Sequence, residues 1–155
     1  MSRTQTAEGV NMETLEMGRV TTEATVENYG DLWMAEKGLI PTEQVQRITV
    51  PDALVDTGAT LLSLPTRMIK QLGLIPVTTK QIVSSKGTTQ AMMYSAVRLT
   101  IMGRSCTVDV MEVPDDVPPL VGQIPLEHLD FVVDPRQQKL IGNPRHGGEH
   151  IYEMY

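Results

Sequence analysis

Alternation of apolar and polar residues along this chain predicts a series of short β-strands. Residues 20–26, 45–50 and 106–110 all alternate with a period of two. Successive side chains of a strand point to opposite faces, so this period is typical of a half-buried strand. Two short runs near the end, Phe131–Val133 and Lys139–Ile141, predict the last strands.

Between these strands the pattern predicts one long hairpin and two short helices. Residues 77–83 and 91–102 form the arms of the hairpin, and small residues with a glycine at 84–89 suit its turn. The first helix is predicted over Pro65–Leu72, because a proline starts it and Gly73 can cap its end. The second is predicted over Pro125–Leu129. Many short strands with two helices predict an all-β barrel or sandwich.

The remaining segments are predicted to be irregular. They are a polar arm at 1–17, a turn at 28–31, an irregular stretch at 32–41 that contains Trp33, a rigid proline-rich loop at 114–119, and a loose tail from residue 142 to the end.

The most distinctive stretch is the apolar run Ala53–Val55, which leads directly into Asp56, Thr57 and Gly58. Apolar residues resume at Leu61. Burying an ionised carboxylate is costly unless the group is paired or neutralised, so an acid inside an apolar run indicates a function. The alternative is an ordinary turn, in which Asp is a turn former and Gly supplies a positive φ.

Four pieces of the chain together resemble a retropepsin-like (retroviral-type) aspartic peptidase of the bacterial soluble kind. They are Leu54–Thr60, Leu72–Leu74, Ser85–Gly87 and Pro119–Gly122. The resemblance runs from about residue 18 to residue 144. It implies a peptidase domain over 18–144, between the arm at 1–17 and a tail at 145–155. The implied fold is an all-β closed barrel with a flap hairpin and two short helices, which acts as a homodimer.

In the family this resemblance points to, the Asp of the loop activates a water molecule, and the Thr and Gly hold the loop. The implied catalytic residues are therefore Asp56, Thr57 and Gly58. The chemistry needs two carboxylates that share one proton. This chain has only one Asp-Thr-Gly, so the second carboxylate is expected from the Asp56 of a second copy.

The resemblance also implies a set of substrate-binding residues: Ala59, Ser85, Lys86, Gly87, Thr88, Val117 and Pro118. The expected partner is a peptide or protein that is held as an added strand. For the hairpin tip alone, a plain turn is the simpler interpretation, and residues 117–118 fit a rigid connection equally well. Viral relatives usually place an arginine after the late glycine, whereas Gln123 stands here. A catalytically inactive peptide-binding or dimerisation module is the alternative function.

Composition and charge limit which partners, compartments and cofactors fit this chain. The net charge of −6 argues against nucleic acid as the main partner, because binding phosphates requires a basic surface. The single cysteine, Cys106, excludes an intrachain disulfide and fits a reducing compartment. No apolar run is long enough to be a signal peptide core or a membrane span, so a cytoplasmic location is expected. The segment from His146 to His150 offers a weak metal site, but no metal or cofactor is expected.

Overall fold

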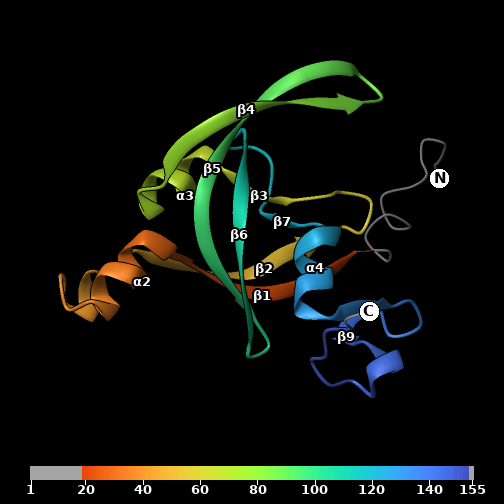
Figure 1. Ribbon diagram of the computed structural model, residues 1–155. Coiled ribbons are helices and arrows are strands. Elements are labelled where there is room, and N and C mark those ends of the chain that lie inside the picture. The colour runs from red at the N-terminus through yellow and green to blue at the C-terminus, as the bar shows by residue number, and fades with distance from the viewer. Residues whose placement is uncertain (1–18, 154–155) are drawn as a thin grey trace.

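The computed structural model describes residues 19–153, and their largest unit is one seven-stranded sheet (Figure 1). Its order is β1-β2-β7-β3-β6-β5-β4, and β1 pairs with β5 as well as with β2. Strand pairing that starts at β1 and passes through β2, β7, β3 and β6 to β5 therefore returns to β1. The strands are β1 Val20–Asn28, β2 Arg47–Val55, β3 Leu62–Pro65, β4 Ile75–Ser84, β5 Gly87–Ile101, β6 Arg104–Val113 and β7 Leu120–Val121. A separate pair consists of β8 Phe131–Asp134 and β9 Lys139–Gly142.

The core packs against this sheet and is built largely from the apolar members of its alternating strands, together with apolar residues of the helices. Val26 on β1, Val97 and Leu99 on β5, and Val110 on β6 are almost fully buried. The prediction of a mainly β protein is confirmed, and so are the predicted positions of the strands at 20–26 and 106–110.

A buried carboxylate ties β1 to both of its neighbours. Glu27 lies opposite Arg47 on β2 and opposite Arg98 on β5. Its oxygens accept from the two guanidinium Nε atoms at 3.1 Å and 3.0 Å. Although Glu27 is only 7% exposed, its charge is compensated from both sides, as a buried acid requires.

Two of the helices begin and end close to the predicted residues. Helix α3, Thr66–Leu72, follows Pro65 and ends at Gly73, whose φ of 64° is the left-handed cap expected of a glycine. Helix α4 spans Gln123–Leu129, two residues longer at its start than predicted.

The prediction of only two helices is wrong, because Tyr29–Glu36 forms a third, α2, in place of the turn and irregular stretch. Asn28 caps it by accepting a hydrogen bond from the Asp31 N–H at 3.0 Å. None of the residues of α2 is buried, so the apolar period that identifies a helix is missing. Two single 3₁₀ turns are also present. One, η3 at Pro144–His146, lies in the predicted loose tail, and the other, η2 at Thr42–Gln44, lies between the predicted irregular stretch and the predicted strand at 45–50.

The predicted hairpin is confirmed as β4 and β5, with a two-residue turn at Ser85 and Lys86. Strand β4 is the free edge of the sheet, and nearly all its residues are exposed. Figure 1 shows the far half of the hairpin projecting over β3 and β7. No helix in the described residues is long and apolar enough to cross a membrane.

The segment after β9 is packed against the body of the protein, contrary to the prediction of a loose tail. Asn143 donates its backbone N–H to the Asp130 carbonyl at 3.0 Å, and the Tyr152 hydroxyl donates to the His128 carbonyl at 2.7 Å. These partners lie at the end of α4, so the contacts are long-range and leave no local trace in the sequence. The predicted arm at 1–17 lies outside the described residues.

Candidate active site

The loop that begins at Asp56 is held in place by its backbone. Strand β2 ends at Val55 and pairs in parallel with β7, where Val55 lies opposite Val121. The Asp56 N–H donates to the Val121 carbonyl at 3.0 Å. The loop turns back at once, because the Ala59 N–H donates to the Asp56 carbonyl at 3.1 Å. One oxygen of the Asp56 carboxylate, Oδ1, accepts from the Gly58 N–H at 2.9 Å. The half-buried carboxylate is thereby oriented by its own loop.

The start of α4 supports this loop from the other side. The N–H groups of Gln123 and Ile124 donate to the carbonyls of Ala59 and Thr60 at 2.8 Å and 3.0 Å. The Gly122 N–H donates to the Leu61 carbonyl at 3.0 Å. The first N–H groups of a helix have no partner within it, and here the carbonyls of the loop take that place.

Gly122 is where the two segments touch. A Cβ added at this position would stand 2.6 Å from the Leu61 carbonyl oxygen and 2.7 Å from the Leu61 nitrogen. Both are backbone atoms, so the neighbour has no flexible end that can move aside. The close approach therefore requires glycine, which explains the residue that ends the Pro119–Gly122 piece of the sequence.

Thr57 and Gly58 form the exposed tip of the loop. Within residues 19–153 the Thr57 hydroxyl has no hydrogen-bond partner, although the backbone around it is well bonded. A short polar side chain at the tip of a fixed loop is in a position to bond to a group outside this chain.

A cavity of about 210 Å³ lies between the loop and the hairpin. Gly58, Ala59, Thr60 and Leu61 line one side, Ile82 and Val83 line the hairpin side, and Ser63 and Met111 complete it. Of the predicted substrate-binding residues, only Ala59 lines it. The hairpin tip residues Ser85–Thr88 are exposed beyond the cavity, and residues 117–118 lie in the loop between β6 and β7, outside its lining.

Ile82 and Val83 are the residues that sequence reasoning missed. They stand just before the turn of the hairpin, and Val83 is 80% exposed. Two adjacent β-branched residues at the end of a long, exposed hairpin are the signal that identifies them. The glycine at the turn is the reason that the sequence points to the tip residues 85–88, and whether those residues contact a substrate stays a prediction.

Other candidate groups are engaged in the body of the fold. Gln123 donates its amide to the Glu127 carboxylate at 3.2 Å, within α4. Cys106 packs against the core, where burial raises the pKa of its thiol to about 11. A thiol with so high a pKa is a poor nucleophile near neutral pH. Among residues 19–153, no group of three or more His, Cys, Asp and Glu side chains could hold a metal ion.

A charged cluster fastens the last residues to the end of α4. The His146 ring contacts the Asp130 carboxylate at 2.6 Å and the Glu153 carboxylate at 2.8 Å. Hydrogen bonds to Glu153 and to Asp130 raise the pKa of His146. Burial alone would raise the pKa of Asp130, but hydrogen bonds from the Ile151 N–H, His146 and Asn143 outweigh it and lower that pKa to about 2.

These shifts predict how the C-terminal cluster responds to pH. The raised pKa of His146 stabilises the fold fully below its ordinary value of 6.5, and this contribution is lost as pH rises through the raised value. The lowered pKa of Asp130 stabilises the fold above its ordinary value of 3.8, and this contribution is lost as pH falls through about 2. We expect His146→Gln to lower Tm more at about pH 5.5 than at about pH 9. Equal losses at both pH values, measured by thermal unfolding, would contradict the pairing.

Residues 44–142, which include the Asp56 loop, the hairpin and α4, match the family described as aspartyl protease. A similar solved structure is the solution structure of the simian foamy virus (mac) protease, with a TM-score of 0.45 and 21% identity. The match covers 70% of this chain and 93% of the viral one. Comparison with curated proteins finds no match.

Proposed function

Since the chain belongs to the aspartyl protease family, we propose that it is an aspartic endopeptidase whose active site forms between two copies. Each copy contributes one Asp56, and the two carboxylates meet on a two-fold axis. A symmetric pair suits this chain because a two-fold contact brings the same residue of each copy face to face. The substrate is a peptide or protein segment in extended form.

One observation carries the proposal. The Asp56 carboxylate is held by the Gly58 N–H on a loop with an exposed tip, beside a cavity that the hairpin covers. An ordinary turn requires neither the support of Gly122 and α4 nor a hairpin above it. The loop is built to hold a carboxylate rigidly beside a space that a ligand can enter, which is what acid–base catalysis requires.

In the proposed reaction the two carboxylates share one proton. The ionised Asp56 takes a proton from a water molecule while the water oxygen attacks the carbonyl carbon of the peptide bond. The protonated Asp56 of the other copy donates its proton to the carbonyl oxygen, which gives a tetrahedral diol. The C–N bond then breaks as the first Asp56 passes the proton it took from water to the leaving nitrogen, and one diol hydroxyl returns a proton to the other Asp56. Two carboxylates in contact cannot both ionise easily, so the shared proton is the stable starting state.

Thr57 and Gly58 are proposed to form the contact between the two copies. The Thr57 hydroxyl, which has no partner within residues 19–153, would bond across the axis to the other loop. The small Gly58 lets the two backbones approach closely. The rigid base for this contact is the sheet, which we propose to be a closed barrel because β1 pairs with both β2 and β5.

The hairpin β4–β5 is proposed to be a flap over the substrate. Ile82 and Val83 would contact substrate side chains from above, while Ala59 lies below. The tip residues Ser85–Thr88 are proposed to close over the substrate when it binds, since a two-residue turn at the end of a free hairpin is easily displaced. Residues 117–118 would reach the substrate only through the second copy or through loop closure.

A reducing compartment such as the cytoplasm is the proposed location. Cys106 is half-buried with a raised pKa, and it is the only cysteine in the chain. Because one cysteine cannot form a disulfide within the chain, the stability of this fold relies on its core and on ion pairs such as those of Glu27 with Arg47 and Arg98.

Cleavage of a random peptide mixture, with and without a statine-type mimic of the transition state, tests the proposed function. Cleavage that the mimic abolishes supports an aspartic peptidase. Binding of peptides without any cleavage would instead support the alternative, a catalytically inactive peptide-binding module. Full cleavage in the presence of the mimic would contradict the assignment.

Dependence on a second copy predicts an effect of dilution. If the active species is a dimer, activity per mole of chain should fall once the protein is diluted below the dimer dissociation constant. The measurement is initial rate against protein concentration on one peptide, with sedimentation at the same concentrations. A monomer in sedimentation that retains constant specific activity would contradict the shared site.

A further inference from the structure

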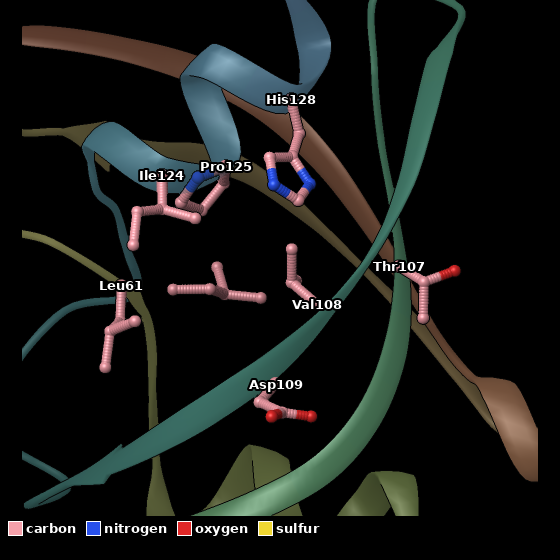
Figure 2. Close-up of a pocket in the computed structure, with 8 residues that line it drawn as sticks. Leu61, Thr107, Val108, Asp109, Ile124, Pro125 and His128 are labelled. Carbon is pink, nitrogen blue, oxygen red and sulfur yellow. The ribbon is translucent and has the colours of Figure 1, made fainter.

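A second cavity, of about 260 Å³, shares the lining residue Leu61 with the cavity under the hairpin. Its walls are mostly apolar. Figure 2 shows Ile124 and Pro125 of α4 near Leu61, with the His128 ring and Val108 of β6 facing them. Ile124 is 38% exposed, so the cavity opens at the surface. None of the roles proposed above uses this space.

The two cavities are neighbours in the fold. Leu61 lines both of them. Along β6, Asp109 borders the second cavity and Met111 borders the first. Residues two apart on a strand share a face and lie about 7 Å apart. An extended peptide has the same spacing between alternate side chains, so one peptide can place a side chain in each cavity.

This part of the sheet is open for a structural reason. Strand β3 begins its pairing with β6 only at Leu62, opposite Val110. The residues before Leu62 do not pair with β6. They form the Asp56 loop and make backbone hydrogen bonds to the start of α4. Residues 107–109 of β6 are consequently unpaired on that side, and the space beside them is filled only in part by Leu61 and Ile124.

We propose that this second cavity is a distal subsite that takes an apolar side chain of the substrate, beyond the residues next to the cleaved bond. The proposal rests on the proposed peptidase function and goes beyond it by assigning a specificity-determining role to Ile124 and Val108. The apolar walls favour a side chain such as that of leucine. Asp109, exposed at the rim, disfavours an acidic side chain there by like-charge repulsion.

The test uses the full chain and peptides that share one cleaved core. Each position from four residues before to four residues after the cleaved bond carries leucine, serine or glutamate in turn. We expect one position outside the central pair to prefer leucine to serine by about tenfold in kcat/KM, as expected when an apolar pocket is left unfilled. Glutamate should be the poorest of the three residues at that position.

Ile124→Asp places a charge in the cavity and should remove the preference for leucine at that position alone. Met102→Lys is the matched control, because Met102 is an exposed apolar residue on the β5–β6 turn and lies outside both cavities. The ratio of leucine to serine peptides is the readout, so an overall loss of activity in Ile124→Asp does not disturb the comparison.

Preferences that are the same in Ile124→Asp and in the native chain at every position would overturn the subsite while leaving the peptidase intact. A change in the sedimentation of Ile124→Asp, with unchanged preferences, would assign the cavity to an interface between copies and also overturn it. Should the native chain cut nothing, Asp56→Asn binding to fluorescent leucine and serine peptides gives the same ratio. Equal affinities, or no binding of either peptide, would then exclude the subsite.

Discussion

Asp56→Asn is expected to abolish peptide cleavage, lowering kcat/KM by at least about 10³-fold. The amide can neither take a proton from water nor supply one to the leaving group. Its oxygen can still accept the hydrogen bond from the Gly58 N–H, so the loop should keep its form. Thermal unfolding should show a Tm equal to or above that of the native chain, because the repulsion between two facing carboxylates is removed.

Asp52→Asn is the matched control for this change. Asp52 is an exposed acid on β2, four residues before Asp56, and it lines none of the cavities described above. It should retain full activity and stability. Cleavage by Asp56→Asn at the native rate would place the reacting carboxylates elsewhere, and a large fall in its Tm would show that Asp56 serves the fold instead.

Gly122→Ala is expected to have the largest effect on stability, lowering the free energy of unfolding by about 3 kcal/mol. The added methyl group would stand 2.6–2.7 Å from backbone atoms of Thr60 and Leu61. Either the start of α4 or the Asp56 loop must move, and the hydrogen bonds that join them would lengthen. Activity should therefore fall even at temperatures where the variant is still folded.

Gly103→Ala separates this packing effect from the general cost of replacing a glycine. Gly103 has a φ of 82° and no atom within 4 Å of an added Cβ, so only the backbone strain remains. Its loss should be about 1 kcal/mol, with activity retained. Urea denaturation of both variants gives the comparison. Equal losses in the two variants would show that the contact at Gly122 is not as tight as described.

The parts of this fold that the sequence predicts are those with a local cause. The alternation at 20–26, Pro65 and Gly73 around α3, and the turn residues of the hairpin each act within a few neighbouring positions. The Asp56 loop is recognisable for the same reason, since an acid directly follows an apolar strand.

The features that the sequence does not predict depend on distant residues. Helix α2 buries none of its side chains, so it lacks the apolar period, and its cap Asn28 is anchored by the Leu72 carbonyl 44 positions away. Residues 151 and 152 are held by Asp130 and His128, at the far end of α4. The lining of the cavity by Ile82 and Val83 depends on how the hairpin folds over the loop, which local pattern alone leaves open.

The central claim is that each active site uses one Asp56 from each of two copies. Native chain and Asp56→Asn chain, mixed in different ratios and allowed to exchange subunits, test it most directly. If both carboxylates are required, activity follows the square of the native fraction, so an equal mixture keeps about one quarter of the full activity. About one half of the activity in that mixture, a linear fall, would mean that each Asp56 acts independently, and about three quarters would mean that one Asp56 per pair suffices. Either result would contradict the shared dyad.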